Sequence, residues 1–133
     1  WHLSKLCAPY MKDAGSGNIV NIASVLGLVG SAPIKQAHYC ASKGAVINLT
    51  RELGMQWARR GIRVNALCPG WFPSEMTQGM DDESSMNFMR ANSPLPRMGE
   101  LHELDGALLL LASDAASFMI GQHVVVDGGW TAR

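Results

Sequence analysis

Tyr39 and Lys43 are four positions apart in the segment Tyr-Cys-Ala-Ser-Lys, at the start of a stretch whose apolar spacing predicts a long helix. Residues at positions i and i+4 of a helix lie on the same face, one turn apart. A lysine ammonium at that distance favours the phenolate form of the tyrosine. A tyrosine in that setting can act as a general acid or base toward a carbonyl or an alcohol.

Ser24 is a second residue that could take part in chemistry, because it ends an apolar, β-branched segment at residues 18–24 that is typical of a buried strand. Ligands of open α/β sheets bind beyond the carboxyl ends of the strands. The Ser24 hydroxyl could therefore hydrogen-bond a substrate oxygen and stabilise charge that develops there. Tyr-x-x-x-Lys alone is a weak pattern, because most such pairs are surface pairs, so its meaning depends on the surrounding elements.

The elements around these residues alternate between helix and strand. Periodicity predicts helices at residues 1–12, 37–60 and 100–113. It predicts strands at residues 18–24, 62–67 and 122–127, and short helices within a polar, methionine-rich segment at residues 71–96. Near-continuous apolar strands between helices indicate an α/β fold with a parallel sheet covered on both faces. The long helix is expected to bury one stripe, made of Ala41, Ala45, Val46, Leu49, Leu53 and Trp57.

The sequence also suggests that residues 1–133 are one part of a single domain. The chain begins with Trp1 rather than Met, and no N-cap residue precedes its first helix. The first strand would lie at an open sheet edge with unpaired backbone groups. We therefore expect the natural polypeptide to extend beyond Trp1.

Composition argues against several classes of protein. Eleven basic residues balance eleven acidic ones, which gives no electrostatic reason to expect a nucleic acid or an anionic membrane as partner. No apolar run approaches the roughly 20 residues that span a bilayer. The three cysteines are odd in number and widely spaced, so we expect reduced thiols in a cytoplasmic protein, without a disulfide framework or a zinc site. Arg59, Arg60 and Arg63 are expected to form a solvated face near a helix end.

Several segments, in order along nearly the whole chain, resemble the short-chain dehydrogenase/reductase family. They are GNIVNIAS at 17–24, YCASK at 39–43, IRVNALCPG at 62–70, PLPRMGE at 94–100, LASD at 111–114 and GQHVVVDGGW at 121–130. The resemblance implies that the chain is the C-terminal part of a doubly wound, Rossmann-like parallel sheet with flanking helices. It also implies an NAD- or NADP-dependent oxidoreductase that transfers hydride between the nicotinamide and a small carbonyl or alcohol substrate.

The resemblance further implies roles for individual residues. Tyr39 would be the general acid or base, Lys43 would bind the nicotinamide ribose and assist Tyr39, and Ser24 would orient the substrate carbonyl. Residues 71–96 would form a lid over the substrate, and the full-length protein would be a homo-oligomer. Besides Tyr39 and Lys43, the residues expected at the cofactor are Pro69, Gly70, Phe72 and Ser74.

Two departures from the family pattern and one absence bear on this prediction. Position 74 is Ser where the family more often has Thr, and it keeps the hydroxyl. The spacing from Ser24 to Tyr39 is longer than in many family members, and we expect the extra residues in the loop at 31–38, beside the substrate pocket. The family's glycine-rich phosphate-binding turn, its NAD- or NADP-selecting residue and its helix asparagine are not in this sequence. An alternative is therefore a truncated, catalytically incompetent family member that acts as a binding or oligomerising module.

Overall fold

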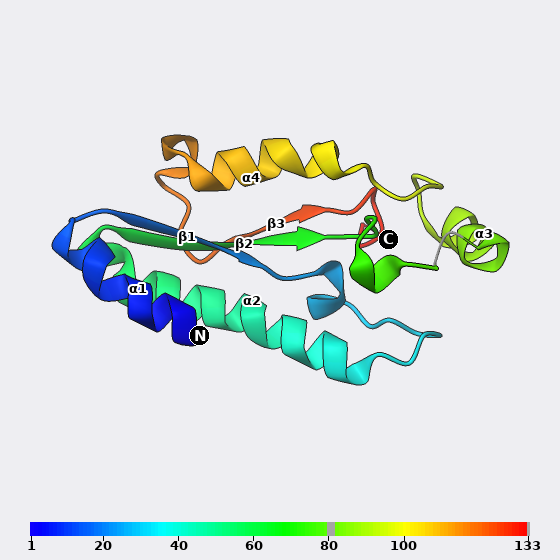
Figure 1. Ribbon diagram of the computed structural model, residues 1–133, viewed down its shortest axis with the longest axis horizontal. Helices are drawn as coiled ribbons and strands as arrows, with labels where there is room; N and C mark the ends of the chain where they lie inside the picture. The colour runs from blue at the N-terminus through cyan, green and yellow to red at the C-terminus, as the bar shows by residue number, and fades with distance from the viewer. Residues whose placement is uncertain (80–81, 133) are drawn as a thin grey trace.

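A parallel sheet of three strands, in the order β1-β2-β3, forms the centre of the chain. The structure is a computed structural model that describes residues 1–79 and 82–132. The strands are β1 (Gly17–Ile22), β2 (Ile62–Pro69) and β3 (His123–Val126). Each connection between strands contains a helix, as parallel neighbours require (Figure 1).

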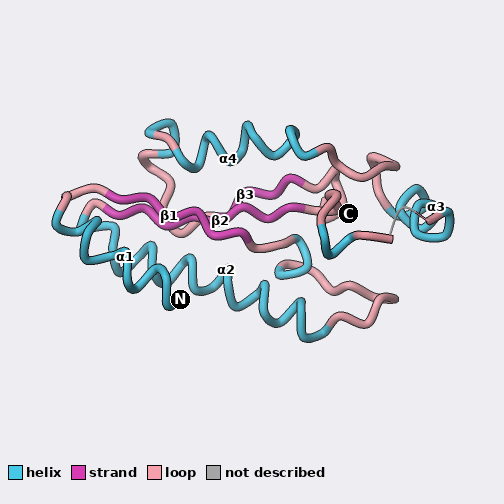
Figure 2. Tube along the Cα trace, in the orientation of Figure 1, coloured by secondary structure: helices cyan, strands magenta, loops and turns pink. Residues whose placement is uncertain are grey.

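Helices cover both faces of this sheet. The helices α1 (His2–Asp13) and α2 (Ala37–Trp57) lie on one face, and α4 (Asp105–Ala112) lies on the other (Figures 1 and 2). A fourth helix, α3 (Glu83–Asn92), lies beyond the ends toward which the strands point. The predicted Rossmann-like α/β architecture with flanking helices is confirmed.

The predicted boundaries need small corrections. The strand β1 ends at Ile22, and Ser24 instead begins a 3-10 turn, η1 (Val25–Gly27). The strand β2 continues to Pro69, beyond its predicted end. The long helix ends in a second 3-10 turn, η2 (Ala58–Arg60), before Gly61 at a φ of 75°. A residue in this left-handed conformation favours glycine.

The buried face of α2 is rotated from the predicted stripe. Leu53 and Trp57 are buried as expected, and Val46 and Leu49 are partly buried, but Ala41 and Ala45 are exposed. The reason is the contact that α2 makes with the 120–121 loop, where a β-carbon on Gly54 would lie 2.8 Å from the Gly121 nitrogen. That close approach turns a different set of residues inward, namely Ile47, Thr50 and Gly54.

Arg63 joins β2 to the end of α4. Its guanidinium donates hydrogen bonds to the carbonyl oxygens of Ser113 at 2.9 Å, Ala116 at 3.1 Å and Leu111 at 3.3 Å. These carbonyls belong to the C-terminal end of α4 and the turn after it, where a cation also stabilises the helix dipole. The expectation that Arg63 belongs to a solvated face is therefore wrong.

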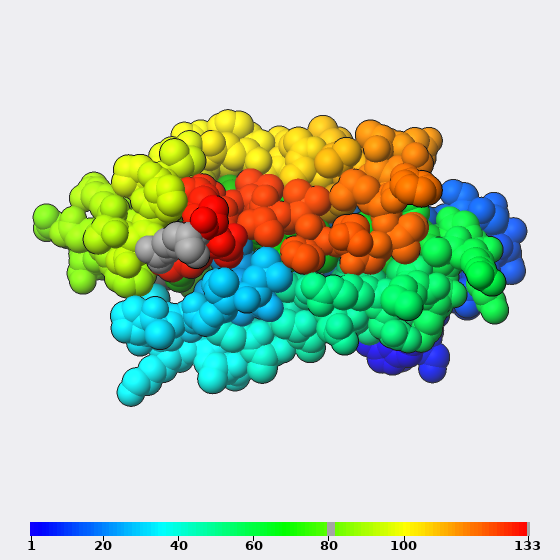
Figure 3. Space-filling model, turned by 180° about the vertical axis from the view of Figure 1, so that it is seen from behind, coloured from blue at the N-terminus to red at the C-terminus, as the bar shows by residue number. Residues whose placement is uncertain are grey.

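Both outer edges of the sheet are unpaired within the part of the chain that the structure describes, because β1 and β3 each pair only with β2. This confirms the expected open edge at the first strand. The other edge, β3, is visible between α2 and α4 in Figure 3. Of the described helices, none has the length and hydropathy that crossing a membrane requires.

Candidate active site

The candidate catalytic residues gather beyond the carboxyl ends of β1 and β2. Figure 1 shows the start of α2, the turn η1 and α3 at the end toward which the strand arrows point. This is the edge at which ligands of open parallel sheets bind. Ser24, Tyr39 and Lys43 all belong to these elements.

Lys43 is fixed between Tyr39 and the end of β1. Its Nζ lies 5.6 Å from the centroid of the Tyr39 ring. The same ammonium donates a hydrogen bond of 3.0 Å to the carbonyl oxygen of Ile22, the last residue of β1. The predicted one-turn spacing on α2 therefore places a cation beside the tyrosine, and the strand end holds that cation in place.

Ser24 is held by the turn that it begins. Its side chain is 7% exposed, and its Oγ accepts a hydrogen bond of 3.1 Å from the backbone N–H of Leu26. The turn packs tightly on α2, since a β-carbon on Gly27 would lie 2.7 Å from the backbone carbonyl of Lys43. Glycine at this position therefore lets the serine turn lie directly against the helical turn that carries the lysine.

Tyr39 packs against a cluster of three buried residues, Val25, Leu26 and Trp130. Its neighbours on that cluster include Trp71 and Phe88, and the Trp71 and Trp130 rings meet edge to face with centroids 5.6 Å apart. The sequence had placed Trp130 only in a C-terminal motif. The structure shows that Trp130 joins the tyrosine to the segment after β2.

Asp127 fixes the loop that carries Trp130. Its carboxylate accepts hydrogen bonds from the backbone N–H groups of Gly129 and Thr131, each at 2.8 Å, and from the Thr131 hydroxyl at 2.7 Å. Burial alone would raise the pKa of Asp127, but the hydrogen bonds from Thr131 and from the loop backbone outweigh it, so this pKa lies below its ordinary value. An ionised Asp127 therefore holds Trp130 in position.

The residues expected at the cofactor follow the end of β2. Pro69 is the last residue of β2, and the Gly70 N–H donates to the Val126 carbonyl at 2.8 Å. A β-carbon on Gly70 would lie 2.7 Å from the Asp127 α-carbon, so this close strand contact requires glycine. Phe72 is buried, with its ring against Gly99.

Ser74 is positioned by Thr77, a residue that the sequence analysis did not single out. Ser74 precedes the 3-10 turn η3 (Glu75–Thr77), and its backbone N–H donates to the Thr77 hydroxyl at 2.7 Å. The Thr77 hydroxyl in turn donates to the Phe72 carbonyl at 2.9 Å. The spacing Ser-x-x-Thr is a capping pattern that could have identified Thr77 in advance.

Two pockets lie on either side of Trp71. The first, about 250 Å³, lies between the loop that precedes α2 and the helix α3; its lining residues are Ile34, Trp71, Ser84, Ser85, Phe88 and Met89. The second, about 240 Å³, lies beside β3 and includes Phe72, Arg97, Glu103 and Asp127 in its wall.

The Trp71 indole N–H is buried and has no hydrogen-bond partner among the described residues. Met80 and Asp81, which belong to the expected lid, lie outside the described residues.

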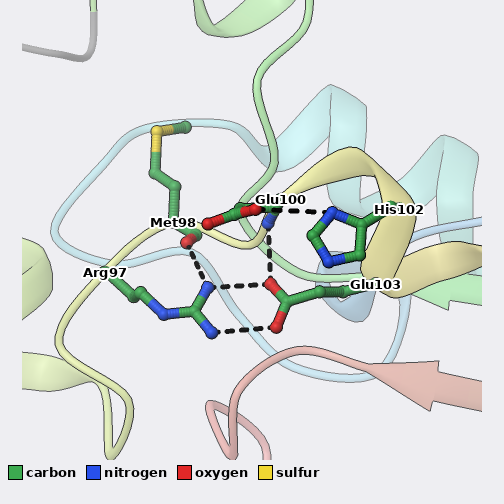
Figure 4. Close-up of polar contacts among 5 residues, drawn as sticks. All are labelled: Arg97, Met98, Glu100, His102 and Glu103. Carbon is green, nitrogen blue, oxygen red and sulfur yellow. Dashed lines mark hydrogen bonds and ion pairs between the residues drawn. The ribbon is translucent and has the colours of Figure 1, made fainter.

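An ion pair fixes the chain where it leaves the expected lid (Figure 4). The Arg97 guanidinium donates to both carboxylate oxygens of Glu103, at 2.7 and 2.8 Å. Glu103 also accepts a hydrogen bond of 2.7 Å from the Glu100 backbone N–H. The Arg97 hydrogen bonds, with that of Glu100, lower the pKa of Glu103 to about 2. The segment that follows residues 71–96 is therefore tied to the start of the helical stretch 101–112.

No group of acidic, histidine or cysteine side chains within the described residues could hold a metal ion. Cys7, Cys40 and Cys68 are free thiols. Cys68 is buried in the core beside Ala66, and burial raises the pKa of its thiol. Such a thiol acts as a packing residue rather than a nucleophile.

Known proteins resemble this chain over nearly its whole length. Residues 1–131 match the family model described as enoyl-(acyl carrier protein) reductase. The cis-4-hydroxycyclohexanecarboxylate dehydrogenase of Sinomonas cyclohexanicum is 43% identical over 92% of this chain and 48% of its own length. The gluconate 5-dehydrogenase of Gluconobacter oxydans is 43% identical over 93% of this chain and 48% of its own.

A solved structure of a dehydrogenase also resembles this chain over nearly its whole length. The gluconate 5-dehydrogenase from Burkholderia cenocepacia, in complex with NADP and tartrate, superposes with a TM-score of 0.91 at 39% identity. The match covers 98% of this chain and 51% of that protein. The chain belongs to the short-chain dehydrogenase/reductase family, which confirms the prediction made from its motifs. It spans about half the length of the curated relatives that it matches.

Proposed function

We propose that this chain, within its natural polypeptide, supplies the acid/base and substrate-facing part of an NAD(P)-dependent oxidoreductase that acts on CH–OH groups. The observation that carries the proposal is the Lys43 ammonium, 5.6 Å from the Tyr39 ring centroid and hydrogen-bonded to the end of β1. Ser24 approaches the same helix turn on η1. A cation, a phenol and a hydroxyl at the carboxyl edge of the sheet suit proton transfer at a substrate oxygen.

Each residue has a defined task in this proposal. In alcohol oxidation the Tyr39 phenolate accepts the substrate hydroxyl proton, and in carbonyl reduction the Tyr39 phenol donates it back. The Lys43 cation, held by the end of β1 beside the Tyr39 ring, would bind the nicotinamide ribose. The Ser24 hydroxyl orients the substrate oxygen and stabilises the charge that develops on it. A bound nicotinamide supplies or accepts the hydride.

The residues after β2 fit a nicotinamide nucleotide. Ser74 offers an exposed hydroxyl at the start of η3, and Gly70 leaves the backbone at the end of β2 free of a side chain. The Ser74 hydroxyl and the Lys43 ammonium are donors suited to ribose and phosphate oxygens, whereas the Gly70 N–H is already bonded to the Val126 carbonyl. Lys43 and Tyr39 would hold the ribose, while Pro69, Gly70, Phe72 and Ser74 would line the nicotinamide and phosphate. The NADP in the Burkholderia cenocepacia protein supports this assignment, with NAD or NADP as the cofactor here.

We also propose a homo-oligomer in the cytoplasm. Large apolar side chains are exposed along α1, where Leu3 is 73% and Tyr10 is 78% exposed. Phe118, after α4, is fully exposed. Surfaces of this kind commonly become covered by a partner copy. The free thiols suit a reducing compartment.

The test uses the natural polypeptide that contains residues 1–133. It is mixed with NAD⁺ or NADP⁺ and a panel of secondary alcohols, and the absorbance of reduced nicotinamide is followed. Saturable nucleotide binding and turnover are expected. A protein that binds neither nucleotide and turns over no alcohol contradicts the proposal and favours the alternative of a non-catalytic binding or oligomerising module.

A further inference from the structure

We propose that the pocket between Ile34, Trp71 and α3 selects a compact, hydrocarbon-rich secondary alcohol or ketone, of the size of a single alicyclic ring, over sugar acids and polyols. This inference rests on the proposed function and names the substrate class of that site. It follows from where the pocket lies, which groups line it and how large it is.

The pocket is connected to the proposed acid/base through shared packing, although Tyr39 itself is not among its lining residues. Trp71 and Phe88 line it, and both pack against the buried cluster on which Tyr39 also packs. Ile34, on the opposite wall, belongs to the loop that leads into α2 and hence to Tyr39. A substrate whose reacting oxygen lies at Tyr39 would therefore extend its remaining carbon atoms into this pocket.

The side chains that line the pocket are mostly apolar, and none of them is charged. Four of its side chains are apolar or aromatic: Ile34, Trp71, Phe88 and Met89. The two polar lining residues are Ser84 and Ser85, and the Ser85 hydroxyl is engaged by the Asp82 carboxylate at the start of α3. A carboxylate or a row of hydroxyls buried here would lose its water without gaining enough partners. Polar, chain-like substrates are therefore disfavoured.

The cations nearest in sequence or space do not line this pocket. Arg97 lies in the second pocket, across Trp71, and is held by both oxygens of Glu103. Arg90 on α3 is exposed and donates to the Asn87 side chain at 3.1 Å. Lys35 is exposed beside Ile34 and is not among the lining residues. Among the described residues, none therefore presents a positive charge to a carboxylate inside the pocket.

The volume of the pocket also indicates the size of the substrate. Its volume of about 250 Å³ lies below the roughly 300–1,000 Å³ of most small-molecule sites. A hydrocarbon ring against Ile34 and the aromatic wall is stabilised because its apolar surface is removed from water. A single ring matches this volume.

The experiment compares two substrate classes on the natural polypeptide with its nucleotide. The measured quantity is kcat/KM for cyclohexanol and cyclohexanone against gluconate and galactitol. We expect the ring compounds to be favoured by at least about 100-fold. Ile34→Asp is expected to lower kcat/KM for cyclohexanol by about 10-fold or more, mainly through KM. The matched control is Val29→Asp, which places the same charge at an exposed residue of the same connecting segment, outside the pocket lining.

A calorimetric titration of the same protein with cyclohexanone and with gluconate separates this inference from the proposed function. Saturable binding of cyclohexanone alone, weakened by Ile34→Asp and not by Val29→Asp, supports the pocket assignment even if no alcohol is turned over. Preferred turnover or binding of gluconate or galactitol overturns the assignment and leaves the oxidoreductase proposal intact. Binding of neither compound also overturns the assignment.

Discussion

The backbone of Gly27 lies against the backbone of Lys43, so close that a β-carbon on Gly27 would be 2.7 Å from both the carbonyl carbon and the oxygen of Lys43. The first residue ends the turn begun by Ser24, and the second carries the ammonium beside Tyr39. Two candidate catalytic residues from distant parts of the chain are thus positioned by one contact between backbones.

Gly27→Ala is expected to separate η1 from α2, because neither backbone can yield without moving its element. Overpacking of this kind costs about 1–3 kcal/mol, and the displacement of Ser24 should lower kcat as well. The measurements are urea unfolding and turnover of the natural polypeptide. Gly30→Ala is the control, because a β-carbon there meets nothing within 4 Å. Equal stability and activity in the two variants would show that the contact does not position the site.

Tyr39→Phe is expected to reduce kcat by about 100-fold or more, since the phenol provides the proton transfer. The ring, which packs on Val25, Leu26 and Trp130, is retained, so the melting temperature should change little. Tyr10→Phe removes the same atom from an exposed ring on α1 and serves as the control. Near-normal turnover in the Tyr39 variant would sink the acid/base assignment.

Arg63→Met is expected to destabilise the fold by about 2 kcal/mol, because three carbonyls at the end of α4 lose a charged donor. Chemical denaturation of the natural polypeptide measures this difference. Arg60→Met makes the same change at an exposed residue of η2 and should have little effect. An equal loss of stability in both variants would mean that the change in net charge explains the result, rather than the hydrogen bonds of Arg63 to these carbonyls.

The lowered pKa of Glu103 predicts how the stability of the fold depends on pH. Hydrogen bonding to Arg97 lowers its pKa from 4.5 to about 2, so the folded state prefers the ionised carboxylate. The resulting stabilisation is present above pH 4.5 and is lost as the pH falls toward 2.

Glu103→Gln should therefore have a lower melting temperature than the native chain above pH 4.5, and the difference should shrink as the pH approaches 2. Glu52→Gln, on the exposed face of α2 next to the neutral Gln56, is the control. A Glu103→Gln difference that stays constant across this range would exclude the ion pair as its source.

Local pattern and family resemblance together predicted much of the site. The i and i+4 spacing of Tyr39 and Lys43 defines their relation on any helix, and apolar, β-branched runs identify buried strands without knowledge of their partners. The helices between the strands indicate that the strands run parallel. These features depend on residues that are neighbours in sequence, which is why the chain alone was enough to predict them.

Contacts between distant segments could not be predicted in this way. The buried face of α2 turns away from Ala41 and Ala45 because Gly54 meets Gly121, a partner far along the chain. Arg63 is adjacent to η2 in sequence, yet its partners are carbonyls at residues 111–116. Trp130 joins the Tyr39 cluster only because the sheet brings the end of β3 beside η1.

The central position of β2 also determines how the chain must fold. Its two pairings join Gly17 to Ile62 and Ala66 to His123, each across a long connection that contains a helix. These pairings stabilise the folded state only after a large loop has closed. Folds that depend mainly on such long-range pairings therefore fold slowly. During that delay β2, whose residues from Val64 to Cys68 are buried in the native state, remains an exposed apolar segment. Its aggregation during synthesis therefore competes with the arrival of β3, which leaves the ribosome later than β2.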